Sequence, residues 1–364
     1  MKIPYVNLSA QWTKEKRKIL SLISSVFKKG EFVNGKDIDN FEKNISRFCD
    51  TKYAVSFNSG TDALTIALIL LGVKRGDEVI TPPNSFISST ASIVHIGAIP
   101  VFADVLRDQN IDPEKIKKLI TKKTKAIMPV HLTGRICEMK KILEISKNYG
   151  VPIVEDAAQS IGSKYFGKKA GSFGSIGCFS AHPLKNLNAA GDGGFFVTNN
   201  STFYYKAQEM KNHGLINRNK VKKFGYISRM DVLQAAILNY RLSNLNAVIL
   251  KRRKNAEFYL KNLDRKKYFV VDEKDYQFNT YHTFVIQTEK RDRLIKYLKK
   301  KGIGSAIHYP IPIHLQPAAK YLNYKKGDFP ATENQAKKII TIPIHENLRQ
   351  KDLDYILNNL NNFN

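Results

Sequence analysis

Short β-branched runs alternate with helical patterns between residues 50 and 200, and this alternation constrains the fold more than any other feature of the chain. It is typical of a parallel sheet whose strands are joined by helices. Strands are predicted at 53–57, 78–82, 101–103, 126–130, 152–155, 176–179 and 195–198. Helices are predicted at 63–71, 88–96, 113–120 and 139–148. The sequence therefore predicts an α/β fold with a mostly parallel central sheet.

The pattern changes after Asp231, where a long helical stretch leads into a tail that mixes strand-like and helical segments. This change predicts a smaller C-terminal α+β domain that is joined to the first by a long helix. We predict an N-terminal segment at 1–14, a large domain at 15–248 and a small domain at 249–364.

The chain is strongly basic, with 59 Lys and Arg against 32 Asp and Glu and a net charge of +27. Such a charge attracts polyanions or anionic metabolites. A nucleic-acid-binding protein is expected to gather its charge on one face or helix. Here the basic residues form short clusters that are spread along the chain, such as 122–123, 251–254 and 299–301. A solvated, lysine-rich surface explains most of this charge, and the remainder fits an anionic small-molecule substrate better than nucleic acid, which we do not expect as a partner.

The cysteines Cys49, Cys137 and Cys178 lie far apart and form no CxxC pair. This spacing indicates neither a disulfide framework nor a zinc site, so we expect no metal and a cytoplasmic location. The densest apolar run, 63–71, is shorter than the roughly 20 residues that a membrane-spanning helix needs. We expect no membrane segment.

Two reactive side chains follow predicted strands. Asp156 comes at the end of the strand at 152–155, where an acid faces the crevice in which α/β sheets bind ligands. It could equally cap the residues that follow it. Lys185 follows the strand at 176–179, in a loop whose glycines permit a close approach to a ligand.

A third strand end carries the turn Ser59-Gly60-Thr61, which opens the helix at 63–71. Free backbone N–H groups, the Thr61 hydroxyl and the helix dipole meet there, and this arrangement binds phosphate. The turn matches neither GxxxxGK[ST] nor GxGxxG, and taken alone it could be only a helix cap.

A phosphate seat, a carboxylate and a lysine at three strand ends together suggest pyridoxal phosphate. The seat would hold its phosphate, the carboxylate would keep its pyridine nitrogen protonated, and the lysine would condense with its aldehyde. Phe86 could stack on the ring, although an aromatic residue after a strand is as often part of the core. Gln159 could reach the phenolic oxygen, and Ser180 could add a hydroxyl to the phosphate.

Motifs from about residue 3 to residue 345 resemble, in order, those of the DegT/DnrJ/EryC1/StrS family of nucleotide-sugar aminotransferases. They include NSGTDAL, GDEVITPPNSF, GAIPVFADV, TKAIMPVHLTG, VEDAAQS, GSFGSIGCFSAHPLKNLNAAGDGG and HYPIPIHLQPA. The resemblance implies a fold type I, aspartate-aminotransferase-like homodimer with active sites at the subunit interface.

The resemblance also implies that pyridoxal phosphate is bound to Lys185 and passes through its pyridoxamine form. It assigns Asp156 to the pyridine nitrogen and Gln159 to the phenolic oxygen. The remaining contacts that it implies are ring stacking by Phe86 and phosphate binding by Gly60, Thr61 and Ser180. Related 3-dehydratases carry histidine at the position of Lys185, so the lysine favours amino transfer.

The implied reaction moves the amino group of L-glutamate to a keto group of a nucleotide-linked 6-deoxy sugar. VNLSAQW, PPNSFISS and VHLTGR resemble most the branch that aminates C3 of dTDP-3-keto-6-deoxyhexoses for surface glycans such as O-antigen. A C4 aminotransferase acting on a UDP- or dTDP-4-keto sugar is an alternative, as is a non-catalytic regulatory or binding protein on the same fold. The galacto or gluco configuration is not determined by these motifs.

One departure concerns the cofactor phosphate. Many relatives have an asparagine at the position of Ile227, and it reaches the phosphate in the neighbouring subunit. Isoleucine cannot donate that hydrogen bond. Either Ser228 or Arg229 replaces the contact, or the contact is absent.

Four residues are candidates for the substrate. His182 replaces a tyrosine of many relatives and either touches the sugar or shapes the loop. By the resemblance, His308 and Tyr309 contact the sugar or its diphosphate, although they could instead form a packed turn. Arg218 is a weaker candidate for the same anion.

Overall fold

Residues 2–363 are the part of the chain that this computed structural model describes. The α-helices are α1 (Leu8–Lys29), α2 (Lys36–Phe48), α3 (Gly60–Leu70), α4 (Ile87–His95), α5 (Pro113–Leu119), α6 (Met139–Tyr149), α7 (Ser201–Met210), α8 (Val232–Asn262), α9 (Arg291–Lys300), α10 (Pro330–Lys338) and α11 (Gln350–Asn361). Short 3-10 helices lie at Leu132–Gly134, Ile313–Leu315 and Pro317–Leu322.

The strands are β1 (Tyr53–Phe57), β2 (Glu78–Thr81), β3 (Ile99–Phe102), β4 (Thr124–Ile127), β5 (Val154–Asp156), β6 (Lys164–Tyr165), β7 (Lys168–Lys169), β8 (Ile176–Ser180), β9 (Gly194–Thr198), β10 (Leu215–Asn217), β11 (Lys220–Val221), β12 (Gln277–Phe278), β13 (Phe284–Gln287) and β14 (Ile339–Ile342). Every strand predicted between residues 50 and 200 overlaps one of these.

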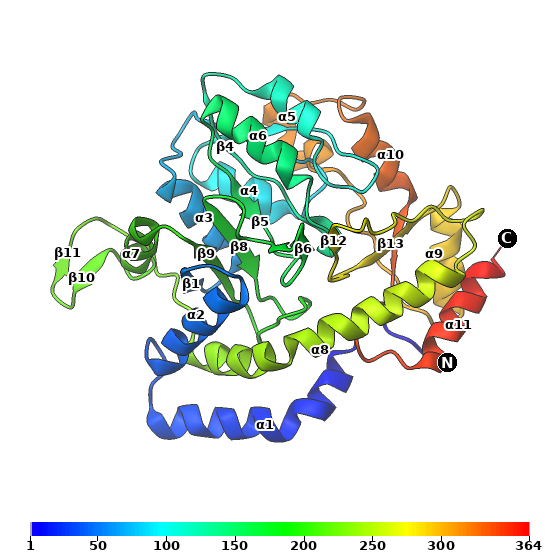
Figure 1. Cartoon of the computed structure of the whole chain (residues 1–364), viewed down its shortest axis with the longest axis horizontal. Helices are drawn as coiled ribbons and strands as arrows, with labels where there is room; N and C mark the ends of the chain where they lie inside the picture. Colours follow the sequence, from blue (N-terminus) through cyan, green and yellow to red (C-terminus); the bar gives the residue numbers. More distant parts are fainter. Residues whose placement is uncertain (1, 364) are drawn as a thin grey trace.

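The central sheet has the strand order β1-β9-β8-β5 on one side and β3-β2-β4 on the other. Two parallel bridges, between Ile127 and Ile153 and between Val130 and Asp156, connect the two groups. Figure 1 shows the sheet in the middle of the molecule with helices packed around it. The predicted α/β class with a mostly parallel sheet is confirmed.

One strand of this sheet, β9, runs against its neighbours. It pairs antiparallel with both β1 and β8, whereas β8 pairs parallel with β5. A parallel return needs a crossover of about a dozen residues or more, usually through a helix. Residues 181–193, between β8 and β9, form no helix. The chain therefore turns back at the same sheet edge, and Lys185 stays beside the end of β8.

Helix α3 begins directly against β8 and β9, and two glycines make this approach possible. Ser59 caps the helix because its Oγ accepts a hydrogen bond of 3.1 Å from the N–H of Asp62. A Cβ atom on Gly60 would lie only 2.8 Å from the Cβ of Ser180, and one on Gly194 would collide with the backbone of Gly60. A side chain at either glycine would push the helix start away from the strands.

Helix α8 passes from one apolar core to another. Ile249 belongs to a core of the central-sheet region, and Ala256, further along the helix, belongs to the core of the C-terminal part. The second core also contains Ile3, which forms a parallel bridge with Ile303. The N-terminal segment therefore packs onto the C-terminal part. The three-part division of the chain stays a prediction, and its outermost residues, Met1 and Asn364, lie outside the described part.

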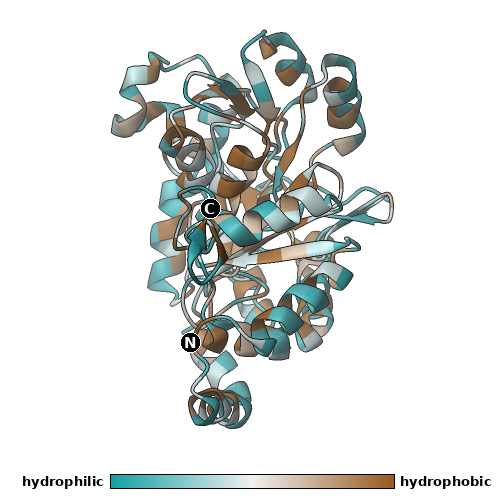
Figure 2. Cartoon of the chain, turned by 90° about the vertical axis from the view of Figure 1, so that its left-hand side faces the viewer, coloured by the Kyte–Doolittle hydropathy of each residue, from teal (hydrophilic) through white to brown (hydrophobic). Residues whose placement is uncertain are grey.

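Hydrophilic residues cover the outward faces of the helices, and apolar residues concentrate on strands inside the molecule (Figure 2). Among the helices formed by residues 2–363, none combines the length and the apolar character needed to cross a membrane.

Helix α1 and the β10–β11 hairpin stand away from the body of the molecule (Figure 1). Both carry large apolar side chains in contact with solvent. On α1 these include Trp12 and Phe27, and Ile216, Val221 and the fully exposed Phe224 lie on or beside the hairpin.

Candidate active site

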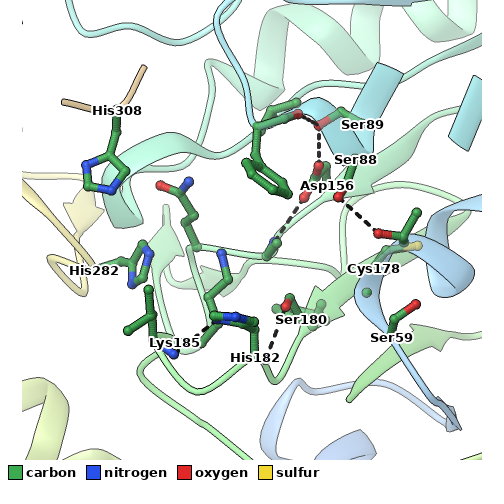
Figure 3. A pocket seen from close by; sticks show the side chains of 18 of the residues that line it. Ser59, Ser88, Ser89, Asp156, Cys178, Ser180, His182, Lys185, His282 and His308 are labelled. Atoms are coloured by element: carbon green, nitrogen blue, oxygen red, sulfur yellow. Dashed lines mark hydrogen bonds between the residues drawn. The ribbon is translucent and has the colours of Figure 1, made fainter. Parts of the chain in front are cut away.

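A cavity of about 320 Å³ lies where the ends of β5 and β8 face the C-terminal part of the chain. Figure 3 shows Asp156, Lys185, His282 and His308 around this shared space. Strand ends of this kind are where α/β sheets bind ligands. The cavity brings together all but one of the residues predicted from the sequence, namely Gly60, Thr61, Phe86, Asp156, Gln159, Ser180, His182, Lys185, His308 and Tyr309.

Asp156, the last residue of β5, is buried, and two donors fix its carboxylate. Oδ2 accepts a 2.7 Å hydrogen bond from the hydroxyl of Ser89, and Oδ1 accepts one of 3.1 Å from the N–H of Ala158. Asp156 therefore does more than cap the following residues, because Oδ2 is held by a side chain of α4.

Lys185 is half-buried in the loop between β8 and β9, and its backbone N–H donates to the carbonyl of His182 at 2.8 Å. Burial lowers the pKa of its amine to about 8, and the negative charge of Asp156 opposes part of that shift. About a tenth of Lys185 is therefore neutral at pH 7, and half is neutral near pH 8. A neutral amine can act as a nucleophile and as a base.

We expect the Lys185 amine of cofactor-free protein to react with an acylating reagent with a midpoint near pH 8. Because a lowered pKa means earlier loss of the proton, the reactive neutral form is half populated there and increases as the pH rises. Mass spectrometry of digested samples from a pH series measures labelling at this position.

The matched variant for this experiment is Asp156→Asn. It removes the charge that opposes the shift, so the midpoint of Lys185 should move to still lower pH. Labelling of Lys185 that follows the same profile as the exposed lysines of the chain would contradict the expectation.

The start of α3 offers hydrogen-bond donors to the cavity. The N–H groups of Gly60 and Thr61 precede the first bond within the helix, in which the N–H of Ala63 donates to Ser59. Ser180 lies opposite, and its Oγ accepts from the N–H of His182 at 3.2 Å, which leaves the hydroxyl hydrogen for a ligand. A helix start with such donors suits an anion.

An aromatic face and an amide complete the cavity. The ring of Phe86 packs 5.7 Å from that of Tyr309, and 54% of Phe86 is exposed. The Oε1 of Gln159 accepts from the N–H of Thr133 at 2.9 Å, so its Nε2 points toward Tyr309, at 3.5 Å from the hydroxyl. An anion seat, an aromatic face, a carboxylate and an amine in one space fit a phosphorylated pyridine aldehyde such as pyridoxal phosphate.

The predicted substrate residues His308 and Tyr309 line the same cavity. The Nδ1 of His308 lies 2.9 Å from the Oγ1 of Thr341, and burial lowers the pKa of this imidazole to about 4. Burial raises the pKa of the Tyr309 hydroxyl well above its usual value. Both side chains are thus uncharged at neutral pH. Such groups suit hydroxyls better than phosphates.

His182 lines the cavity and also shapes its loop. Its ring Nδ1 accepts a 3.3 Å hydrogen bond from the N–H of Leu184, and its backbone bonds to Ser180 and Lys185. The two roles that the sequence left open for His182, contact with the sugar and shaping of the loop, are therefore compatible.

Arg218 does not line the cavity. It lies in the turn between β10 and β11, on the projecting hairpin (Figure 1). The hairpin directs Arg218 away from the body, and its contact with the substrate stays a prediction.

The two residues beside Ile227 have partners within the chain. The hydroxyl of Ser228 donates to the Oδ1 of Asn58 at 3.2 Å, and Arg229 donates to the Oδ1 of Asn212 at 2.9 Å. Ile227 itself is 63% exposed. The hydroxyl hydrogen of Ser228 is therefore used within the chain, whereas Arg229 keeps further N–H donors.

Arg252 is a cavity residue that the sequence analysis assigned to surface charge. Its Nη1 donates to the carbonyl of His282 at 3.2 Å, and its Nη2 pairs with Glu346 at 3.1 Å. A signal for its burial was present in the helical spacing, because it lies on the same face of α8 as the buried Leu245, Ile249 and Ala256.

His282 and Tyr5 were also missed. Burial, followed by the charge of Lys185, lowers the pKa of His282 well below its usual value, and the side chain lines the cavity. Tyr5 comes from the N-terminal segment, and its ring lies 5.7 Å from that of His308. Only the packing of the C-terminal part against the sheet region brings these residues to the site.

Residues 13–361 match the DegT/DnrJ/EryC1/StrS aminotransferase family. A "Pleiotropic regulatory protein" from Geobacillus stearothermophilus is 36% identical, over 100% of this chain and 99% of that protein. The dTDP-3-amino-3,6-dideoxy-alpha-D-galactopyranose transaminase of Aneurinibacillus thermoaerophilus is 34% identical over 99% of each chain.

Among solved structures, DesV of S. venezuelae in complex with a ketimine intermediate is 33% identical. It superposes with a TM-score of 0.96 over 99% of this chain and 98% of that one. The likeness extends over nearly the whole length and confirms the fold that the sequence motifs implied.

Proposed function

The chain is an aminotransferase of the DegT/DnrJ/EryC1/StrS family, and from this premise we propose that it moves the amino group of L-glutamate to a keto group of a nucleotide-linked 6-deoxy sugar. The observation that carries the proposal is the meeting of Lys185, Asp156 and the start of α3 in one cavity. An amine, a carboxylate and an anion seat are what amino transfer with pyridoxal phosphate needs.

The residues of the cavity would hold this cofactor at both ends. Gly60, Thr61 and Ser180 bind its phosphate, and Asp156 keeps its pyridine nitrogen protonated. Phe86 covers one ring face, and the Nε2 of Gln159 donates to the phenolic oxygen. When bound, pyridoxal phosphate supplies an electron sink for the carbanion that forms when a proton leaves the donor.

Lys185 would move protons in both halves of the reaction. Its neutral Nζ takes the proton from the α-carbon of glutamate, and it later returns a proton to the carbon of the sugar that accepts the amine. The lowered pKa of about 8 suits this work because the amine gains and loses a proton near the operating pH.

The proposed acceptor is C3 of a dTDP-3-keto-6-deoxyhexose, which gives a 3-amino-3,6-dideoxy sugar for a surface glycan. The Aneurinibacillus relative is named for such a product. In the cavity, the uncharged His308 and Tyr309 would bind sugar hydroxyls. Amination at C4 of a UDP- or dTDP-4-keto sugar is the alternative.

A regulatory protein is the second candidate function, because the Geobacillus relative carries a regulatory name. Retention of the reactive amine beside a fixed carboxylate favours catalysis, since a binding module needs neither a lysine of lowered pKa nor a buried Asp156.

We expect purified holoenzyme to convert L-glutamate to 2-oxoglutarate in an amount equal to the bound cofactor when no sugar is present. The reaction stops there because the amino group remains on the cofactor. Chromatography of the product and the visible spectrum of the protein measure the two sides of this exchange, with L-glutamine and L-aspartate as control donors.

The protein is then mixed separately with dTDP- and UDP-linked 3-keto and 4-keto sugars. Only the true acceptor should take the amino group and return the cofactor to its starting form. Bound cofactor with no spectral change on adding any of the donors would contradict the enzyme and favour the regulatory candidate.

We further propose a homodimer with active sites at the subunit interface. Its support is the exposed apolar surface on α1 and on the hairpin, where Phe224 is fully exposed and Ile227 is 63% exposed. Apolar surface of this kind usually marks an interface. Arg218 belongs to the same hairpin, so in the dimer it would serve the diphosphate bound to the neighbouring subunit.

A further inference from the structure

The first turn of α4 directs two consecutive serines to opposite ends of the cavity. Ser89 donates to the carboxylate of Asp156 at 2.7 Å, at the ring end of the proposed cofactor site. Ser88 contacts Thr61, whose Oγ1 donates to the Oγ of Ser88 at 2.9 Å, at the start of α3. Figure 3 shows both serines and these bonds.

The hydroxyl hydrogen of Ser88 is available for a further hydrogen bond. In its bond with Thr61 it is the acceptor, so its own hydroxyl hydrogen is not used there. Among the hydrogen bonds formed by residues 2–363, none is donated by this hydroxyl. The side chain is half-buried and lines the cavity beside the start of α3.

The surrounding groups favour an anion as the missing acceptor. The N–H groups at the start of α3 and the hydroxyl of Ser180 lie in the same part of the cavity. The first turn of α4 adds further donors, because Phe86 at its N-cap provides no side-chain cap. Donors from two helix starts match the oxygens of a phosphate.

We propose that Ser88 binds the phosphate of the cofactor, next to Thr61 and from the same subunit. The inference rests on the proposed use of pyridoxal phosphate. Ser88 also supplies a phosphate contact from α4 in a chain whose Ile227 cannot donate one. The phosphate seat is thus completed by α4 rather than by the neighbouring subunit.

The test compares two ligands that differ only in the phosphate. Cofactor-free protein is titrated with pyridoxal phosphate and with pyridoxal, and binding is followed by visible absorbance. A hydrogen bond to a charged group corresponds to roughly a ten- to hundredfold change in affinity. Ser88→Ala should therefore weaken the affinity for pyridoxal phosphate by about ten- to a hundredfold. It should leave the affinity for pyridoxal unchanged.

Two controls separate the hydroxyl from the packing of α4. Ser92→Ala removes a buried hydroxyl of the same helix, one that bonds to the carbonyl of Ser89 and does not line the cavity. It should leave both affinities as in the parent protein. Ser88→Thr and Ser88→Val have nearly the same shape, and only the threonine variant should retain the phosphate-dependent affinity.

The inference is overturned if Ser88→Ala and Ser88→Val bind both ligands as the parent protein does, or if they weaken both ligands equally. Its failure differs from that of the proposed function, in which the parent protein itself would bind no pyridoxal phosphate. If the Ser88→Ala protein does not fold, the comparison of Ser88→Thr with Ser88→Val decides the question.

Discussion

Replacing Lys185 with alanine is expected to slow amino transfer by about 10³-fold or more. The variant lacks the amine that anchors the cofactor and the base that moves protons. Lys185 is half-buried in a loop between β8 and β9, so the protein should remain folded without its side chain. Mass spectrometry of the sugar product measures the rate, and circular dichroism checks the fold.

Lys185→Arg is the informative partner of this variant. It keeps a long basic side chain, but guanidinium stays charged at any working pH and therefore cannot act as a nucleophile or base. It should be as inactive as the alanine variant. An arginine or alanine variant with more than a tenth of the parent rate would show that another group performs the chemistry.

Replacing Asp156 with asparagine is expected to lower the rate by about 10²- to 10³-fold, the usual effect of removing one preorganised electrostatic group. Asparagine has nearly the same shape, and the Ser89 hydroxyl can turn to accept from its amide. Only the negative charge facing the pyridine nitrogen is lost. Steady-state rates with glutamate and the keto sugar measure the effect.

Ser89→Ala is the graded control for Asp156. It removes one of the two donors that hold the carboxylate and leaves the charge in place. Its loss of rate should be clearly smaller than that of Asp156→Asn. If the asparagine variant keeps more than a third of the parent rate, Asp156 has only the structural role of a cap.

The strand-end groups could be located from the sequence because their positions depend on local patterns. A short apolar run that is followed by a polar residue predicts where β5 and β8 end. Parallel strands bring such ends to one edge of the sheet. Asp156 and Lys185 therefore fell into one cavity as expected. The direction of β9 was not anticipated, because alternation along a strand has the same period in either orientation.

The C-terminal side of the cavity could not be predicted in this way. His282 and Arg252 reach the site only when one core packs against another, and no local pattern encodes that packing. Arg252 also illustrates how a basic run at 251–254 conceals a buried position on a helix. The position of Arg218 could not be predicted either, since a hairpin that leaves the body has the same sequence signals as one that folds back.

The covalent attachment of the cofactor to Lys185 is the central claim, and borohydride reduction followed by peptide mass spectrometry tests it most directly. Reduction makes the linkage permanent, and each lysine of the digest can then be examined separately. The peptide that contains Lys185 should carry the mass of the cofactor in full proportion to the bound amount. Cofactor found on other lysines instead, or an unmodified Lys185 in protein that holds the cofactor, would contradict the claim.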